Sequence, residues 1–207
     1  MDPKAMYSLT YGVFMVATRV GDKMNGCITN TVIQVAANPT RLALSCISTN
    51  LTTEMIRKSG VFSVSILDQT CTFETIRHFG LQSGRDVDKF SGLEPPLTDG
   101  GLPYLSWATC AVMSCRVVET HDLGSHILFI AEIDDMFRTS EEAPLTYADY
   151  QNRLKPKKVE QPKATRKIIG WRCKICNYVY EGEELPKDFT CPVCGHDASD
   201  FEPVYAD

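Results

Sequence analysis

Two C-x-x-C pairs near the C-terminal end carry the clearest chemistry in the sequence. Cys173 and Cys176 form the first pair, Cys191 and Cys194 the second, and fourteen residues separate the pairs. Each pair can fold into a tight knuckle that directs two thiolates at one point. Two facing knuckles make a tetrahedral sulfur cage that selects iron or zinc. Iron in such a cage transfers single electrons, whereas zinc is structural, and the spacing alone leaves both metals open.

The residues around the cysteines are also those that a metal knuckle needs. The backbone must turn beneath the metal after each second cysteine, often with a positive φ. Gly195 follows Cys194, and Asn177 follows Cys176; asparagine is among the few non-glycine residues that tolerate this region. A module of about forty residues cannot build a large core, so we expect it to rely on a metal and a few large rings. The rings are Trp171, Tyr178, Tyr180, Phe189 and Phe201.

The segment W-R-C-K-I-C-N-Y-V-Y-E-G, followed by F-T-C-P-V-C-G and D-F-E-P-V, resembles rubredoxin. The short gap between the cysteine pairs is most similar to the rubredoxin-type module of rubrerythrins. The resemblance implies one iron held by four cysteines, Fe(Cys)4. A full-length rubredoxin has a longer insertion between the pairs. Its absence leaves the redox potential open, because exposure and hydrogen bonds to sulfur set that potential.

Five further cysteines are scattered along the first 115 residues, and we interpret them as reduced, mostly buried small hydrophobes. The N-terminal segment is short and polar, unlike an apolar signal segment. The sequence contains no run of about eighteen apolar residues, so no membrane span is predicted. These features predict a cytoplasmic protein without a membrane partner. A catalytic thiol is the alternative interpretation of one of the five. They are Cys27, Cys46, Cys71, Cys110 and Cys115.

The distribution of charge predicts two domains joined by a linker. Residues 1–154 hold 12 basic and 17 acidic residues, and residues 168–207 hold 3 and 8, so each has a net charge of −5. Residues 155–167 hold 6 basic residues, 1 acidic residue and two prolines, which is typical of a linker. The acidic balance of the whole chain argues against nucleic acid as a partner.

The apolar pattern of residues 1–154 predicts a mainly β fold with a few helices. We expect strands over residues 11–20, 31–36, 41–48, 61–67, 108–120 and 125–137. Asn50 is the predicted N-cap of a helix that ends at Gly60, and a second helix is expected over residues 71–79. This order of elements does not alternate between strand and helix, which favours a closed or split β-barrel. No G-x-G-x-x-G motif follows a strand, which argues against a Rossmann domain.

Three polar clusters interrupt the apolar pattern, at residues 25–31, 45–52 and 79–89. Hydroxyls and amides at strand ends can hold a planar polar ring, and a helix N-terminus near Thr52 can hold a phosphate. Arg85 or Lys89 could add positive charge to that phosphate. Each cluster alone is typical of turns. Together they favour one phosphate-bearing heteroaromatic ligand.

These clusters also carry a family resemblance. The stretches N-G-C-I-T-N-T-V-I-Q-V, S-T-N-L-T-T-E-M-I, F-G-L-Q-S-G-R-D-V-D-K-F and G-S-H-I-L-F-I-A-E-I resemble the flavin-reductase-like, FMN-binding split-barrel family over nearly all of residues 1–154. The resemblance implies a homodimer with one FMN near the subunit interface. It places Thr29, Asn30 and Thr31 near the flavin ring, and Ser48, Asn50 and Thr52 near the ring edge or the phosphate. The resemblance also assigns Ser83, Arg85 and Lys89 of the third cluster to the FMN site.

His126 is the candidate for the nicotinamide side of that site, with a satisfied structural histidine on a strand as the alternative. We interpret the remaining histidines as structural. They are His78, His121 and His196.

The fusion of the two modules is similar to the high-molecular-weight rubredoxins of anaerobic bacteria. That resemblance implies that NAD(P)H delivers a hydride to FMN, that single electrons pass to the Fe(Cys)4 centre, and that a flavo-diiron oxygen or nitric oxide reductase is the acceptor. The flavin would be the adapter between a two-electron donor and a one-electron acceptor. A flavin or ferric reductase with an accessory metal module, and a non-enzymatic electron carrier, remain as alternatives. NADH and NADPH are not distinguished by any residue.

Overall fold

The computed structural model describes residues 2–156 and 168–205, which form two compact units with a boundary after Lys155. Residues 157–167, most of the predicted linker at 155–167, lie outside the described residues, so the linker stays a prediction. None of the helices in the described ranges has the length and apolar character needed to cross a membrane.

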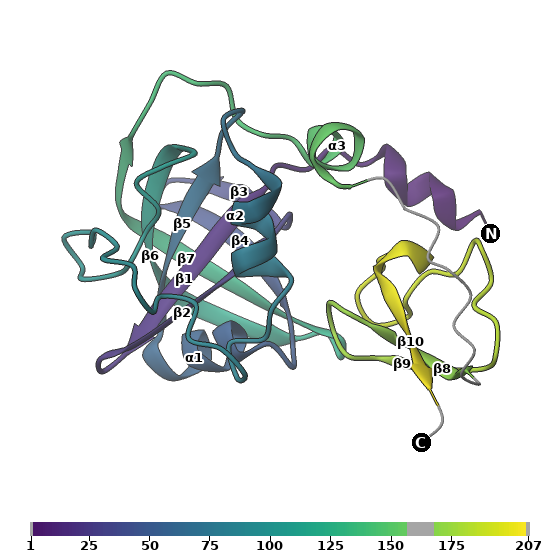
Figure 1. Cartoon of the computed structure of the whole chain (residues 1–207). Helices are drawn as coiled ribbons and strands as arrows, with labels where there is room; N and C mark the ends of the chain where they lie inside the picture. The colour runs from purple at the N-terminus through teal and green to yellow at the C-terminus, as the bar shows by residue number, and fades with distance from the viewer. Residues whose placement is uncertain (1, 157–167, 206–207) are drawn as a thin grey trace. The chain divides into compact units, whose positions relative to one another are not determined.

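The large unit is built on one antiparallel sheet that curves into a barrel (Figure 1). The strand order is β2-β1-β5-β6-β7-β4-β3. The predicted mainly β split-barrel class is thereby confirmed. The strands are β1 (Phe14–Val20), β2 (Lys23–Thr29), β3 (Val32–Ala37), β4 (Thr40–Ile47), β5 (Val61–Leu67), β6 (Thr109–Asp122) and β7 (His126–Arg138).

The barrel closes around an apolar core because the strands bury alternate or continuous runs of apolar side chains. Val16, Leu44, Phe62, Val64 and Phe129 come from four different strands, and none of their surface is exposed. Burial of a side chain of this size stabilises the fold by about 1.5–3 kcal/mol relative to exposure. The core therefore fixes the register of the strands whose ends carry the polar clusters.

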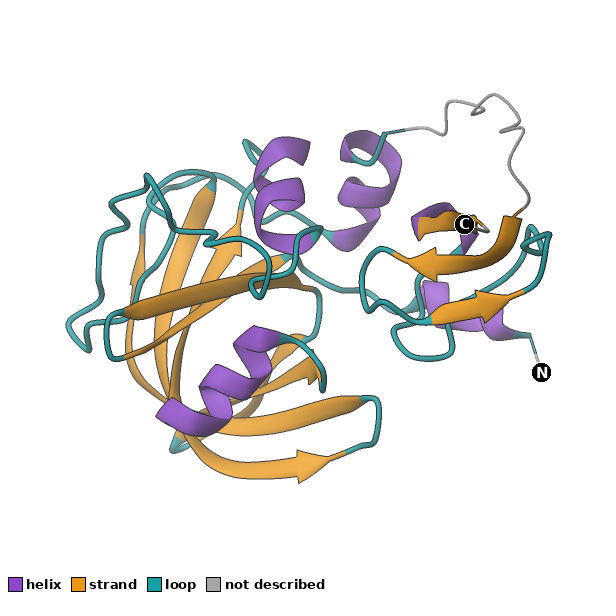
Figure 2. Ribbon diagram, turned by 60° about the horizontal axis from the view of Figure 1, so that its bottom comes forward, coloured by secondary structure: helices purple, strands orange, loops and turns teal. Residues whose placement is uncertain are grey.

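Helix α1 (Leu51–Ser59) lies across one end of the barrel (Figures 1 and 2). The Asn50 side chain accepts a hydrogen bond from the Thr52 amide at 2.9 Å, and Gly60 ends the helix with a φ of 74°. Both caps are as predicted from the sequence. The first turn of α1 is thereby fixed next to the ends of β2 and β4.

We expect Asn50→Ala to lower the free energy of unfolding by about 1 kcal/mol, because the Thr52 amide loses its acceptor. Urea denaturation of the flavin-free protein checks this value. Asn152→Ala, at an exposed position, is the matched control and should change stability by less than about 0.5 kcal/mol. Equal effects of the two substitutions would contradict the capping role.

Other elements of the large unit differ in detail from the prediction. Helix α2 (Phe73–Gly80) is followed by irregular chain up to β6. Strand β2 was not predicted, since residues 25–31 were interpreted as a polar ligand-binding cluster that interrupts the apolar pattern. The short elements η1 (Pro3–Ser8), α3 (Tyr147–Asp149) and η2 (Tyr150–Leu154) were also missed. The capping box between Thr146 and Asp149 is the local signal for α3.

The small unit is a three-stranded sheet with a short helical turn. Its strands are β8 (Ile168–Cys173), β9 (Val179–Glu181) and β10 (Phe201–Tyr205), in the order β10-β8-β9, and η3 spans Ala198–Asp200. The Phe189 ring lies 4.7 Å from that of Tyr180 and 5.3 Å from that of Phe201, measured between centroids. Aromatic rings and the four cysteines therefore make up the core, as predicted for so small a module.

Candidate functional site

Two backbone knuckles hold the four C-terminal cysteines. In the first, the Asn177 amide donates to the Cys173 carbonyl at 2.9 Å, and Asn177 has a φ of 63°. In the second, the Gly195 amide donates to the Cys191 carbonyl at 2.9 Å, and Gly195 has a φ of 72°. The predicted positive φ values are confirmed at both positions. The two turns are equivalent, so each directs its pair of sulfurs inward.

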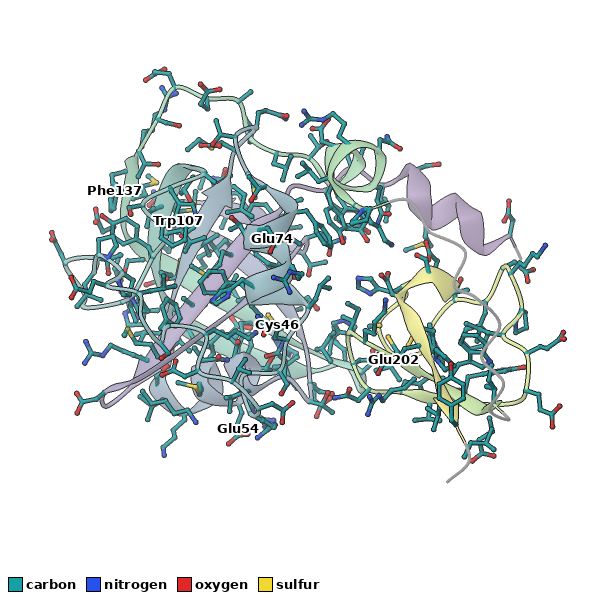
Figure 3. The ribbon with its side chains drawn as sticks, in the orientation of Figure 1. Cys46, Glu54, Glu74, Trp107, Phe137 and Glu202 are labelled. Atoms are coloured by element: carbon teal, nitrogen blue, oxygen red, sulfur yellow. The ribbon has the colours of Figure 1, made fainter. Side chains whose placement is uncertain are left out.

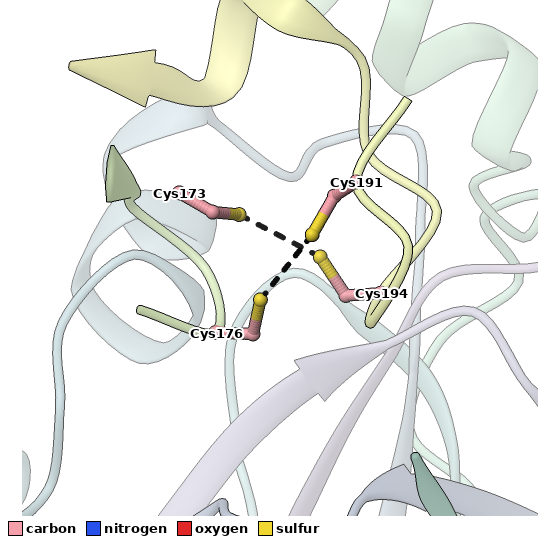
Figure 4. A group of neighbouring side chains, drawn as sticks. All are labelled: Cys173, Cys176, Cys191 and Cys194. Carbon is pink, nitrogen blue, oxygen red and sulfur yellow. Dashed lines mark hydrogen bonds between the residues drawn. The ribbon is translucent and has the colours of Figure 1, made fainter. Parts of the chain in front are cut away.

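The four sulfurs converge on one point (Figure 4). The Cys173 Sγ lies 3.6 Å from the Cys194 Sγ, the Cys176 Sγ lies 3.5 Å from the Cys191 Sγ, and all four lie within 4.8 Å of one another. Tetrahedral coordination with metal–sulfur bonds of about 2.3 Å requires sulfur–sulfur separations of about 3.8 Å. The sulfur cage therefore has the size and shape for one tetrahedral metal ion.

Exposure differs between the four ligands. Cys173 and Cys191 are buried, whereas Cys176 and Cys194 are half-buried. An ion in the cage would approach the surface on the side of Cys176 and Cys194. Electron transfer would be shortest through that side.

The thiols influence one another strongly. A hydrogen bond from the Cys194 thiol and backbone amides lower the pKa of Cys173 to about 5. The same contact raises the pKa of Cys194, and burial raises the pKa of Cys176 to about 12. Proximity thus favours ionisation of one sulfur and opposes ionisation of its neighbours. A dication at the centre would reverse that opposition, because metal binding releases the thiol protons.

The first and second polar clusters meet at one end of the barrel. The Thr31 hydroxyl donates to the Ser45 carbonyl at 2.7 Å, and the Ser45 amide donates to the Thr31 carbonyl at 3.0 Å. The Thr29 and Thr31 hydroxyls lie 2.8 Å apart. Asn30, between them, is half-buried. The ends of β2, β3 and β4 thus present hydroxyl and amide groups together.

His126 joins this end of the barrel. It is the first residue of β7 and pairs with Ile47 of β4, next to Ser48. The Ser48 amide donates to the Ser125 carbonyl at 3.0 Å, and the His126 Nδ1 lies 2.9 Å from the Ser125 hydroxyl. The structure therefore brings His126 to the second polar cluster.

The third cluster divides into a buried part and an exposed part. Lys89 is 2% exposed, and its ammonium donates to the Gly26 carbonyl at 2.9 Å and the Phe79 carbonyl at 2.7 Å. Desolvation by burial lowers the pKa of Lys89. The Arg85 guanidinium instead is exposed and pairs with Glu54 of α1 at 2.8 Å. The hydroxyl of Ser83 accepts a hydrogen bond from the Arg85 amide at 3.1 Å.

Sequence reasoning missed the importance of Asn25, which links the clusters. Its side chain donates to the Thr52 hydroxyl at 2.8 Å, deep under the first turn of α1. A Cβ on Gly84 would collide with the Asn25 side-chain oxygen, so any larger residue there would displace Asn25. A hollow of about 440 Å³ borders this contact, and Asn25, Arg85 and Phe90 are among its lining residues. An asparagine at a strand position is the signal that could have identified this link.

Comparison with protein families gives two matches. Residues 6–154 match the flavin reductase like domain, and residues 171–202 match the rubredoxin-like domain of rubrerythrin. The chain is 35% identical to the high molecular weight rubredoxin of Moorella thermoacetica, over 99% of this chain and 100% of that protein. It is 33% identical to a ferric-chelate reductase (NAD(P)H) of Archaeoglobus fulgidus, over 76% of this chain and 93% of that protein.

Solved structures share the fold of the large unit. An FMN-binding protein from Thermus thermophilus matches with a TM-score of 0.63 and 22% identity, over 76% of this chain and 92% of that chain. Flavoredoxin from Methanosarcina acetivorans matches with a TM-score of 0.61 and 23% identity, over 75% of this chain and 90% of that chain. At these identities the likeness shows the fold alone.

The residues present fit the groups that these families imply. One iron suits the four convergent sulfurs, since a tetrahedral set of four thiolates is a site for iron or zinc. FMN suits the large unit, because the family match covers residues 6–154 and because polar residues at the strand ends and the N-terminal end of α1 offer groups of the kind that a flavin ring and a phosphate need. The chain therefore belongs to the flavin reductase-like family, as a member that carries a rubredoxin-like domain at its C-terminal end, like high molecular weight rubredoxin.

Proposed function

We propose that this chain is an NAD(P)H-dependent oxidoreductase that passes electrons through bound FMN to an iron in the four-cysteine cage and on to a redox protein. The presence of a flavin-reductase-like unit and a four-sulfur cage in one chain carries the proposal. The similarity to high molecular weight rubredoxin over the full length of both proteins supports it. The final acceptor in this proposal is a flavo-diiron oxygen or nitric oxide reductase, and the working form is a homodimer.

Each group of residues has a separate task in this proposal. Bound FMN supplies acceptance of a hydride and release of single electrons. Thr29, Asn30 and Thr31 orient the ring through hydroxyl and amide groups, as the hydrogen-bonded end of β2 and β4 allows. His126 faces the nicotinamide side. The half-buried sulfurs of Cys176 and Cys194 give the route by which electrons enter and leave the iron.

The phosphate of FMN is assigned to the first turn of α1. Ser48, Asn50 and Thr52 lie at or before this turn, where the helix dipole favours an anion. Ser83 and Arg85 add donors from the third cluster, and Arg85 already contacts α1 through Glu54. Lys89 contributes a buried positive charge next to β2, where its ammonium donates a hydrogen bond to the Gly26 carbonyl.

Anaerobic addition of NADH or NADPH to the FMN- and iron-loaded protein tests the proposal. We expect the flavin absorbance to bleach first and the visible iron–thiolate bands to bleach next, with no other protein present. A flavin that stays oxidised would instead identify the chain as a carrier that needs a separate reductase. The faster of the two nucleotides identifies the physiological donor.

A second candidate function is supported by the relative from Archaeoglobus fulgidus. That ferric-chelate reductase is matched over 76% of this chain, so direct reduction of chelated ferric iron by the large unit is the competing activity. Deleting residues 156–207 distinguishes the two. We expect the deletion to leave ferric-chelate turnover within about twofold and to abolish delivery to a flavo-diiron acceptor, since the cage supplies the one-electron step. Unchanged delivery by the truncated chain would favour the simple reductase.

A further inference from the structure

The barrel contains a pair of neighbouring thiols to which the proposed electron route assigns no task. Cys27 lies on β2 and Cys46 on β4, and their exposed fractions are 4% and 3%. They belong to the same apolar core cluster, and the two side chains are close enough for each to shift the pKa of the other. Cys46, labelled in Figure 3, is buried in the core of the large unit. Both are thiols rather than a disulfide in this structure.

The backbone on one side of the pair is held by hydrogen bonds between β2 and β4. The Thr29 hydroxyl donates to the Ser45 carbonyl at 3.4 Å. Thr29 comes two residues after Cys27, and Ser45 comes directly before Cys46. The two strands lie at opposite ends of the sheet order, apart from the edge strand β3, so this contact closes the seam of the barrel. The two cysteines are therefore side by side across the seam.

Helix α1 holds the other side of the pair. Asn25, two residues before Cys27, donates to the Thr52 hydroxyl at 2.8 Å. The Thr53 hydroxyl donates to the carbonyl of Ile47, directly after Cys46, at 2.8 Å. Consecutive residues of one helical turn thus grip both cysteine-bearing strands. Both strands are therefore held at positions next to their cysteines.

The surroundings make the two thiols chemically unequal. The hydrogen bond from Cys46 and the nearby charge of Lys89 lower the pKa of Cys27 to about 7, and the same contact raises the pKa of Cys46. The Lys89 ammonium is anchored on the carbonyl of Gly26, next to Cys27. Oxidants react with a thiolate rather than a thiol. Cys27 is thus the nucleophile that reacts with the oxidant, and Cys46 is the resolving thiol that reacts with the oxidised Cys27.

We propose that Cys27 and Cys46 are an oxidisable pair, which closes into a disulfide between β2 and β4 when hydrogen peroxide reaches it. The Cys27 sulfur attacks one peroxide oxygen, the O–O bond breaks, and a sulfenic acid and one water form. The Cys46 sulfur then attacks the sulfenic sulfur, the S–O bond breaks, the S–S bond forms, and a second water leaves. Two thiols and one peroxide thus give one disulfide and two waters.

Closure of the disulfide would alter the neighbouring polar contacts. A disulfide has an S–S length of about 2.05 Å, shorter than any contact between two separate thiols, so the two side chains must draw together. The Asn25–Thr52 and Lys89–Gly26 hydrogen bonds lie directly beside this movement. Oxidation of the pair would therefore affect the end of the barrel that holds the polar clusters.

Peptide mapping of the full-length, iron-loaded protein tests this proposal. After treatment with equimolar hydrogen peroxide, trypsin separates Cys27 and Cys46 into the peptides 24–41 and 42–57. We expect mass spectrometry without reductant to find these peptides joined, with a mass two hydrogens below their sum, and to find them separate after reduction. Wild-type protein that shows no such link, or that links these peptides no more than other cysteine pairs, would overturn the proposal.

Two variants fix the order of the steps. In Cys46→Ala we expect dimedone, a sulfenic acid probe, to label the peptide 24–41, because the second thiol is missing. Cys115→Ala is the matched control, since Cys115 is equally buried in the same core, and it should form the Cys27–Cys46 link as wild type does. Dimedone on the peptide 42–57 of Cys27→Ala, with none on 24–41 of Cys46→Ala, would contradict Cys27 as the nucleophile.

Discussion

Replacing Cys191 by serine is expected to stop electron delivery to the acceptor while NAD(P)H still reduces the bound flavin at the wild-type rate. Cys191 is buried in the cage, and its sulfur is one of four that lie within 4.8 Å of one another. Loss of a thiolate removes a ligand, and since changes around metal ligands already cost about 10–100-fold, onward transfer should fall by at least ~100-fold. The flavin unit has its own core and should be unaffected.

Stopped-flow absorbance measures both steps of this prediction in one experiment. Flavin bleaching reports the first step, and reduction of the acceptor reports the second. Cys110→Ser is the control, because Cys110 lies outside the cage and serine keeps the hydrogen-bonding group that contacts the Ile66 carbonyl. Normal onward transfer in Cys191→Ser would remove the iron from the route.

Replacing Lys89 by methionine is expected to lower the free energy of unfolding by about 3 kcal/mol and to weaken FMN binding at least ~10-fold. Methionine fills a similar volume but leaves the Gly26 and Phe79 carbonyls without their buried donor. Each buried unsatisfied group costs about 1–3 kcal/mol. The Lys89 ammonium also ties β2 to α2, and β2 contacts the first turn of α1 through Asn25, so loss of the ammonium should reach the proposed phosphate site. Urea denaturation and flavin fluorescence titration measure the two effects.

Lys58→Met is the matched control for Lys89, because Lys58 is exposed on α1. It should change stability by less than about 0.5 kcal/mol. The pH dependence gives a second check. Burial lowers the pKa of Lys89 below its ordinary value of 10.5. The unfolded chain therefore binds this proton more tightly than the folded chain does. As a result, the contribution of Lys89 to the free energy of unfolding rises as the pH increases toward 10.5. Lys89→Met should lack that rise. If Lys89→Met keeps wild-type stability and FMN affinity, the two hydrogen bonds from the Lys89 ammonium are unimportant.

The metal cage could be predicted almost completely from the sequence because its determinants are local. Each knuckle is four or five residues long, and the positive φ values fall on Asn177 and Gly195, residue types that tolerate them. The helix caps at Asn50 and Gly60 follow the same logic. In each case the interacting atoms lie close together along the chain, so the spacing already contains the geometry.

The arrangement of the polar clusters could not be predicted in this way because it depends on contacts between distant segments. The Asn25–Thr52 and Lys89–Gly26 hydrogen bonds join residues 27 and 63 positions apart. Strand β2 has no alternating apolar pattern, because the buried side chain of Asn25 bonds to Thr52 of α1, and so it was not predicted as a strand. The buried state of Lys89 likewise depends on the register of β2 against α2 and has no local signal.

The visible spectrum and metal content of the purified, FMN-loaded protein test the central claim most directly. The proposed relay predicts one iron per chain and red iron–thiolate bands superposed on the yellow flavin spectrum, with the red bands absent from Cys191→Ser. Metal analysis would be carried out on the same sample. Protein that contains zinc in place of iron, and shows no absorbance beyond that of flavin, would contradict an electron route through the four cysteines.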